Sequence, residues 1–98
     1  MLLLFMGLLF KCKETEKIWY GEHSRKLPTN LQMIAKRKLR MLNNVTTLTE
    51  IQKVPGNMLE KLKGDRQGQY SIRINNQWRI CFKWVRNNAV DVAIDDYH

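Results

Sequence analysis

The fold of this chain is decided by two neighbouring stretches, which read YSIRI at residues 70–74 and WRICFKW at residues 78–84. Apolar and polar residues alternate in both, and a period of two is typical of half-buried antiparallel strands. A third stretch, VDVAI at residues 90–94, is predicted to turn alternate residues to the core, namely Val90, Val92 and Ile94. The opposite face of the first two strands is predicted to present polar and cationic side chains: Ser71, Arg73, Arg79, Cys81 and Lys83.

Short reversals are predicted between these strands. Asn75-Asn76 separates the first two strands, and Asn87-Asn88 separates the second from the third. Asn tolerates the positive φ that tight hairpin turns require. Gly64 and Gly68 allow a similar reversal after a short strand at residues 58–62. The pattern therefore predicts an antiparallel meander.

The N-terminal half is predicted to add one strand and two helices. Residues 1–10 are apolar apart from Gly7. They are too few to span a bilayer as a helix, and they lack the positive start of a secretory signal. We therefore expect a first strand, buried within the sheet. A short helix is predicted at residues 13–20, and a longer one from Pro28 to Asn43-Asn44.

The longer helix is amphipathic. Its apolar stripe follows the spacing of one helix face: Leu31, Ile34, Ala35, Leu39 and Leu42. Lys36, Arg37 and Arg40 lie on another face, which can extend a track for a phosphate backbone. Lys38 lies beside the stripe, where its stem can be buried. The following connector, residues 45–54, is expected to hold at most one helical turn, at Thr49-Glu50-Ile51.

The predicted element order is β-α-α-β-β-β-β. It indicates an α+β fold, in which two N-terminal helices pack on one face of an antiparallel sheet. With 98 residues the chain has room for one domain, which we place at residues 1–98.

Charge points to an anionic partner. The chain has 17 Lys and Arg against 9 Asp and Glu, a formal net charge of +8. A small domain so basic usually meets phosphate, nucleic acid or an acidic protein, although positive charge can also serve solubility alone.

The cysteines and histidines give no sign of a metal centre. Cys12 and Cys81 are far apart and have no Cys or His at ligand spacing, so neither a disulfide framework nor a zinc site is expected. His23 and His98 are the only histidines. We predict a cytoplasmic protein with reduced thiols, without a metal or cofactor and without a membrane partner.

Several short motifs together resemble one toxin family. They are LEKLKGDR at residues 59–66, GQYSIR at 68–73, QWRICF at 77–82 and the terminal DYH at 96–98, with CKETEKIW at 12–19 and RKLRML at 37–42 upstream. The combination closely resembles the HigB toxins of the RelE superfamily of toxin–antitoxin systems, over nearly everything from Phe10 onward. Met6 stands where family members begin, which implies that Met1 to Phe5 are an N-terminal extension.

The resemblance implies a ribosome-dependent mRNA endonuclease. Such toxins cut mRNA in the ribosomal A site without a metal, with the 2′-hydroxyl as nucleophile. The implied partners are a HigA-like helix-turn-helix antitoxin, the ribosome with its mRNA, and operator DNA bound through the toxin–antitoxin complex.

The resemblance also implies a reactive chain end. The reaction needs a base, an acid and cations against the phosphate. His98 is the natural acid or base, because an unperturbed imidazole has a pKa of about 6.5. Tyr97 is expected to anchor the chain end, to stack on a base or to assist deprotonation, and Asp96 to orient His98. The residues leave acid and base open among Glu60, Asp96, Tyr97 and His98.

Two cations complete the implied catalytic set. Arg79 is expected to stabilise the scissile phosphate, and Lys63 to lie near it. The plainer interpretations are a cross-sheet partner of Asp91 or Asp95 for Arg79, and an exposed hairpin cation for Lys63. Four further cations are expected to hold RNA: Lys61, Arg66, Arg73 and Lys83. For Arg66 and Arg73, contact with the antitoxin is the alternative.

One position departs from the family pattern. Some members have a His where this chain has Glu60, so a pair of histidines as acid and base is not available here. Glu60 can act as a base or pair with a cation. Two other functions stay open: a ParE-like toxin that inhibits DNA gyrase, and a nucleic-acid-binding module without activity.

Overall fold

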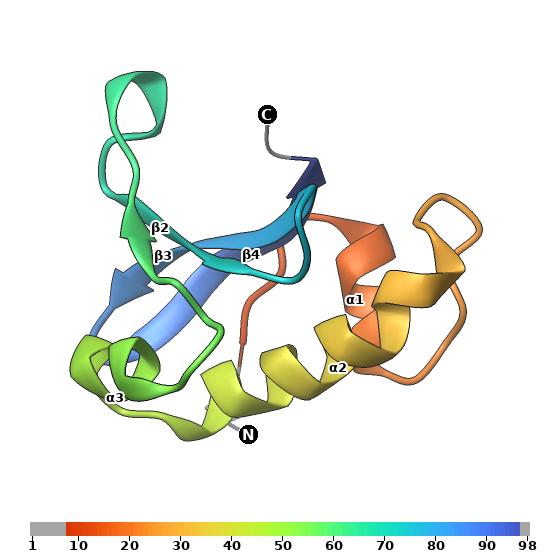
Figure 1. The fold of residues 1–98 in the computed structure, drawn as a ribbon, viewed down its shortest axis with the longest axis horizontal. Coiled ribbons are helices and arrows are strands. Elements are labelled where there is room, and N and C mark those ends of the chain that lie inside the picture. Colours follow the sequence, from red (N-terminus) through yellow and green to blue (C-terminus); the bar gives the residue numbers. More distant parts are fainter. Residues whose placement is uncertain (1–7, 97–98) are drawn as a thin grey trace, which may run out of the picture.

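The computed structural model describes residues 8–96, and this part of the chain forms a sheet with helices packed on one side (Figure 1). In chain order the elements are α1 (Lys13–Trp19), α2 (Thr29–Asn44), α3 (Leu48–Lys53), β1 (Glu60–Lys61), the 3₁₀ turn η1 (Gly64–Arg66), β2 (Gln69–Arg73), β3 (Trp78–Val85) and β4 (Asn88–Asp96). The four strands pair antiparallel in the order β1-β2-β3-β4. The predicted α+β fold is confirmed.

The core lies between α2 and one face of the sheet. Four residues of the predicted stripe are buried in α2, namely Leu31, Ala35, Leu39 and Leu42. They share one cluster with Ile72, Ile80 and Phe82 of the central strands. Burial of a large aliphatic side chain is worth about 1.5–3 kcal/mol, so this contact is a main source of the fold's stability.

The predicted first strand is wrong in the described part of the chain. Phe10 forms a single parallel bridge to Val92, flanked by 3.0 Å hydrogen bonds from the Val92 amide to Leu9 and from the Lys11 amide back to Val92. The pairing stops there because α1 begins at Lys13, only two residues beyond Lys11. The rest of this prediction, and the proposed extension Met1 to Phe5, lie outside the described residues.

A third helix replaces the single turn expected in the connector. Helix α3 begins after Thr47, whose hydroxyl accepts a 3.2 Å hydrogen bond from the Glu50 amide. Glu50 reaches back in turn and accepts a 2.7 Å hydrogen bond from the Thr46 amide. Thr-x-x-Glu is the sequence form of a capping box, so the signal for this helix was present at residues 47–50.

A bulge in β4 shifts the predicted core positions. Cys81 pairs with Ala93, but Lys83 pairs with Val90, so β4 holds one extra residue at this point. Asp91 takes up the irregularity with a φ of +53°. Val92 and Ile94 face the core as predicted, whereas Ala89 is buried and Val90 is only half-buried. A bulge turns the preceding residues to the other face of a strand.

The reversals form as predicted, with one change of position. Gly64 and Gly68 have φ values of +65° and +94°. The β3–β4 turn uses Arg86 and Asn87 rather than Asn87-Asn88, with φ values of +51° and +66°. Asn75 acts through its side chain, which accepts hydrogen bonds from the amides two and three residues later. The meander itself is therefore confirmed.

Candidate active site

Arg79 lies at the centre of the polar face of the sheet, held on several sides. Its Nε donates to the Ser71 hydroxyl at 2.7 Å, and its Nη2 donates to the carbonyl oxygens of Met58 at 2.5 Å and Ser71 at 3.3 Å. The Glu60 carboxylate lies 4.0 Å from Nη2. A buried guanidinium is costly unless its donors are satisfied, and these acceptors engage Nε and Nη2 and fix the orientation of the group.

The expectation that this face presents its side chains to solvent is wrong in the middle of the sheet. Ser71 and Cys81 are buried, and Arg79 is only 8% exposed. The reason is local: β1 pairs with β2 opposite Ser71, and the Met58 carbonyl is bonded to the guanidinium of Arg79. A partly enclosed cation acts more strongly on a nearby phosphate than one in open water.

Arg66 is brought to the same face by the 3₁₀ turn. Its Nη2 lies 2.6 Å from the Asp95 carboxylate, and this hydrogen bond raises the pKa of Arg66 above its usual value. Asp95 is the cross-strand neighbour of Arg79. In the structure Asp95 makes its ion pair with Arg66, and the Glu60 carboxylate lies 4.0 Å from Arg79.

The end of β4 lies beside Arg66 and Arg79 and is held by two hydrogen bonds. The Ile94 amide donates to the buried Thr15 hydroxyl of α1 at 3.0 Å, and Gln77 Nε2 donates to the Asp96 carboxylate at 3.0 Å. In Figure 1, the end of β4 and η1 rise on the same side of the sheet. Asp96 therefore has a defined place near Asp95, while Tyr97 and His98 lie outside the described residues.

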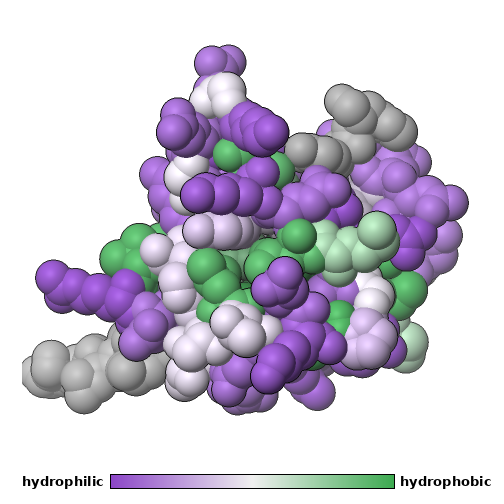
Figure 2. Space-filling view, turned by 60° about the vertical axis from the view of Figure 1, so that its left-hand side comes forward, coloured by the Kyte–Doolittle hydropathy of each residue, from purple (hydrophilic) through white to green (hydrophobic). Residues whose placement is uncertain are grey.

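The β1 hairpin carries two further candidates. Lys61 and Lys63 are exposed, and they border a hollow of about 380 Å³ that Leu62, Gly64 and Gln67 complete. Figure 2 shows mostly hydrophilic side chains on the projecting part of this hairpin. Glu60 pairs with Ser71 across β1 and β2, and its carboxylate lies 4.0 Å from Arg79. It therefore connects the hairpin to Arg79.

Arg73 and Lys83 lie at different ends of the polar face. Arg73 pairs with Arg79 across the β2–β3 ladder and is half-buried, and its guanidinium donates to Asn76. Lys83 is exposed and lies 3.4 Å from the Asp91 carboxylate. It is four residues beyond Arg79 along β3, roughly 13 Å at the rise of a strand. The structure therefore gathers Arg73 with Arg79 and leaves Lys83 apart.

Cys81 is adjacent to the cluster without being a nucleophile. Burial, with the charge of Asp95, raises the pKa of its thiol to about 11. Because the thiolate is the reactive form, Cys81 stays inert near neutral pH.

The sequence reasoning missed three supports of the site: Ser71, Met58 and Gln77. Ser71 was predicted to lie on the polar face, in the strand next to that of Arg79. This position was the available signal for a contact between the two side chains. No pattern indicates that the Met58 carbonyl holds Arg79, since this contact depends on a φ of +45° at a non-glycine residue.

Comparison with known proteins identifies the family. The family model described as the RelE-like toxin of type II toxin–antitoxin system HigB matches residues 8–98. The chain belongs to this HigB-like toxin family.

Relatives of this HigB-like toxin agree with that assignment. Toxin HigB-1 of Vibrio cholerae serotype O1 is 32% identical over 93 residues, which cover 94% of this chain and 98% of the relative. Endoribonuclease HigB of Proteus vulgaris is 37% identical over 59 residues, covering 58% of this chain and 64% of the relative. The resemblance read from the motifs is confirmed.

Solved structures show the same fold at low identity. The YoeB–YefM complex from Staphylococcus aureus contains a chain with a TM-score of 0.62 and 21% identity, covering 96% of the HigB-like toxin and 98% of that chain. The YoeB/ParE toxin from Agrobacterium tumefaciens has a TM-score of 0.56 and 14% identity, covering 95% and 99%.

Residues 8–96 lack the features of a metal site and of a membrane span. No three His, Cys, Asp or Glu side chains gather there as metal ligands. No helix in the same range is long and apolar enough to cross a membrane.

Proposed function

We propose that this toxin is a ribosome-dependent endoribonuclease that cleaves mRNA in the A site. The observation that carries the proposal is that Ser71 and Met58 hold the Arg79 guanidinium in place on the polar face of the sheet. The name of the Proteus vulgaris relative, Endoribonuclease HigB, supports the reaction class.

The proposed chemistry is an internal transfer at phosphorus, without a metal. A base removes the proton of the 2′-hydroxyl, whose oxygen then forms a bond to the adjacent phosphorus. The bond to the 5′-oxygen breaks, and an acid protonates this leaving oxygen. The products are a 2′,3′-cyclic phosphate and a new 5′-hydroxyl, so atoms and protons balance.

Arg79 stabilises the negative charge that grows on the phosphate oxygens. Because its Nε and Nη2 are held by protein acceptors, little reorganisation is needed when the charge develops. Lys63 of the hairpin reaches the same phosphate, and Lys61, Arg66, Arg73 and Lys83 hold the RNA around it.

Acid and base come from the chain end and Glu60 in this proposal. Asp96 orients His98, Tyr97 contacts the RNA, and His98 exchanges a proton with substrate. Glu60 lies 4.0 Å from Arg79 and is half exposed, a position from which it pairs with the cation or accepts a proton.

The proposed partners follow from the family. A HigA-like antitoxin with a helix-turn-helix neutralises the toxin, and the pair binds operator DNA; the ribosome and its mRNA are the target. The structural likeness to the toxin of the YoeB–YefM complex supports an antitoxin partner. These proposed partners support a cytoplasmic toxin.

Primer extension on a translated mRNA tests the proposal. Wild type is compared with His98→Ala, with and without ribosomes, and Arg86→Asn in the β3–β4 turn is the matched control. Cuts that need ribosomes, are lost in His98→Ala and persist in Arg86→Asn are expected. Absence of cuts under every condition contradicts the endonuclease and favours a gyrase-directed or binding-only toxin.

A further inference from the structure

Lys38 of α2 makes contacts that none of the proposed roles explains. It is half-buried, and its Nζ donates to two backbone carbonyls, those of Arg73 at 2.5 Å and Gly56 at 3.1 Å. Burial first, and then the charges of Arg37, Arg73 and Arg79, lower the pKa of Lys38. A half-buried lysine is costly as a cation, so its place here calls for a specific role.

Those two carbonyls belong to the segments that hold Arg79. Gly56 is two residues before Met58, whose carbonyl accepts from the Arg79 guanidinium. Arg73 is two residues after Ser71, whose hydroxyl and carbonyl accept from the same side chain. Lys38 therefore joins the two segments that hold Arg79, one at residues 56–58 and the other at residues 71–73.

The segments are also joined directly between these points. The Arg73 amide donates to the carbonyl of Asn57 at 2.7 Å. Asn57 is 1% exposed, and its Nδ2 donates to the Ile51 carbonyl of α3 at 3.0 Å. Lys38 and Asn57 thus fix residues 56–58 against α2, α3 and β2.

Met58 needs such restraint. Its φ of +45° is rare for a residue other than glycine and persists only where the surroundings impose it. The same conformation turns its carbonyl to Arg79. When residues 56–58 relax, the Met58 carbonyl is expected to turn away and release one side of the guanidinium.

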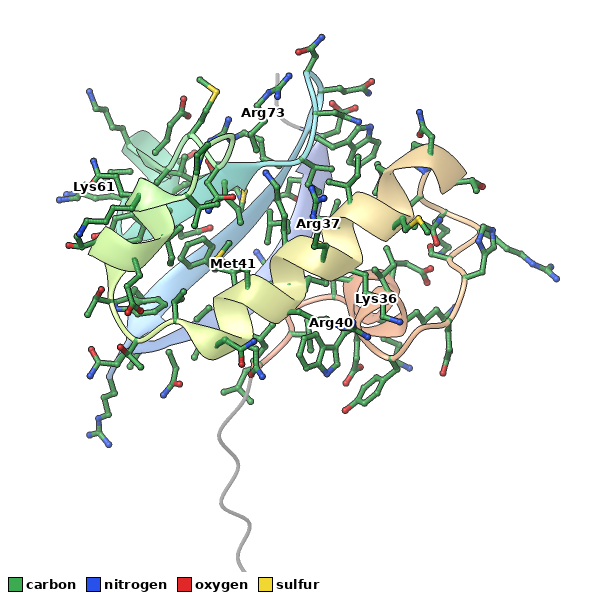
Figure 3. The ribbon with its side chains drawn as sticks, turned by 60° about the horizontal axis from the view of Figure 1, so that its bottom comes forward. Lys36, Arg37, Arg40, Met41, Lys61 and Arg73 are labelled. Atoms are coloured by element: carbon green, nitrogen blue, oxygen red, sulfur yellow. The ribbon has the colours of Figure 1, made fainter. Side chains whose placement is uncertain are left out.

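The neighbouring cations of α2 have another arrangement. Figure 3 places Lys36 and Arg40 on one flank of α2, and Arg37 and Met41 on the flank toward β2 and Arg73. Arg37 is exposed, whereas Lys38 directs its ammonium group into the protein at two carbonyls. A general contact with RNA therefore does not account for Lys38.

We propose that Lys38 is a positioning residue, which sets the orientation of Arg79 by clamping residues 56–58 to the end of β2. Its effect on RNA cleavage rests on the proposed function. Its effect on the Arg79 side chain does not, because the clamp exists in the toxin alone.

The test compares Lys38→Met, which removes both donors, with Lys38→Arg, which keeps them. Lys53→Met, at the exposed end of α3, is the control for loss of a positive charge. Single-turnover cleavage of ribosome-bound mRNA gives the rate constant and the half-saturating ribosome concentration. Hydrogen exchange of the Arg79 Nε–H, followed by NMR of the free toxin, reports the guanidinium itself.

Lys38→Met is expected to slow cleavage about 100-fold, as a misplaced catalytic group does, with the half-saturating concentration unchanged. Exchange at Arg79 is expected to accelerate in the same variant. Lys38→Arg is expected to restore both, and Lys53→Met to change neither. Where Lys38→Met is too unstable, Lys38→Gln carries the same expectation, since its shorter side chain cannot reach both carbonyls.

An unchanged rate in folded Lys38→Met, or a lost rate with unchanged exchange at Arg79, overturns the proposal. If the wild-type toxin cleaves no mRNA, the proposed function has failed. The exchange measurement still decides in that case: acceleration in Lys38→Met supports the clamp, and wild-type exchange overturns it.

Discussion

Arg66 and Asp95 form an ion pair at 2.6 Å that ties the 3₁₀ turn after β1 to the end of β4. Each side chain is about one third exposed, at 34% and 35%. The contact joins residues 29 positions apart and borders Asp96, where the described chain ends. It therefore relates the hairpin that carries Lys63 to the proposed catalytic chain end.

The pair is expected to stabilise the fold modestly. A double-mutant cycle with Arg66→Met and Asp95→Asn should give a coupling free energy of roughly 0.2–1 kcal/mol, because solvent screens a pair this exposed. Urea unfolding of the four proteins measures it. A cycle without coupling means that the two side chains are not paired in solution.

Cys81 is expected to resist alkylation. Its pKa of about 11 lies two units above the usual 9.0, so its thiolate fraction near pH 8 falls roughly a hundredfold. Iodoacetamide labelling, read by mass spectrometry of peptides, compares the native toxin with the same toxin in urea. Equal labelling of Cys81 in both states contradicts the burial of this thiol.

The same shift predicts a dependence of stability on pH. The folded state holds the Cys81 proton at pH values where the unfolded state has lost it. The free energy of unfolding contributed by this group is therefore complete below pH 9 and falls as pH rises from 9 toward 11. Urea unfolding at a series of pH values measures this fall, which should be smaller in Cys81→Ala. An identical slope of the unfolding free energy against pH in the variant would contradict the raised pKa of Cys81.

Glu60→Gln is expected to lower cleavage by less than tenfold. Arg79 keeps its bonds to Ser71 and Met58 in this variant, and the amide removes only a charge at 4.0 Å. Single-turnover assays measure the rate. A base is worth about 10²–10⁴-fold, so a loss in that range would assign the base to Glu60.

The proposed nucleophile can be tested on the RNA. A 2′-O-methyl group at the nucleotide before the cut removes the hydroxyl that attacks, so cleavage at that position should stop while neighbouring positions stay open to the toxin. Primer extension on programmed ribosomes reads both. Unchanged cutting of the methylated position would rule out attack by the 2′-oxygen.

The sheet was predictable because its signals are local. Alternation of apolar and polar residues identifies β2 and β3, and Gly64 and Gly68 mark the reversal before them. The bulge was not predictable from VDVAI, since Val90 and Val92 continue a regular alternation that the positive φ of Asp91 interrupts. Only pairing with β3 reveals the extra residue.

The charged residues of the candidate site could be predicted from the sequence, but the contacts that bury Arg79 could not. Family motifs identified Arg79 and Arg66, and the strand pattern placed Arg79 on the polar face. Nε and Nη2 of Arg79 donate to Ser71 and Met58, which are distant from it in sequence and are brought to it by the tertiary fold. Residues that act through a backbone carbonyl leave no side-chain pattern to read.

In the proposed mechanism Arg79 stabilises the phosphate during cleavage of ribosome-bound mRNA. Arg79→Lys keeps the charge but not the planar set of donors, and circular dichroism with thermal unfolding checks that it folds. We expect a single-turnover rate about 100-fold or more below wild type, because a lost electrostatic donor typically costs that much. A folded Arg79→Lys toxin that cuts mRNA at the wild-type rate would contradict it.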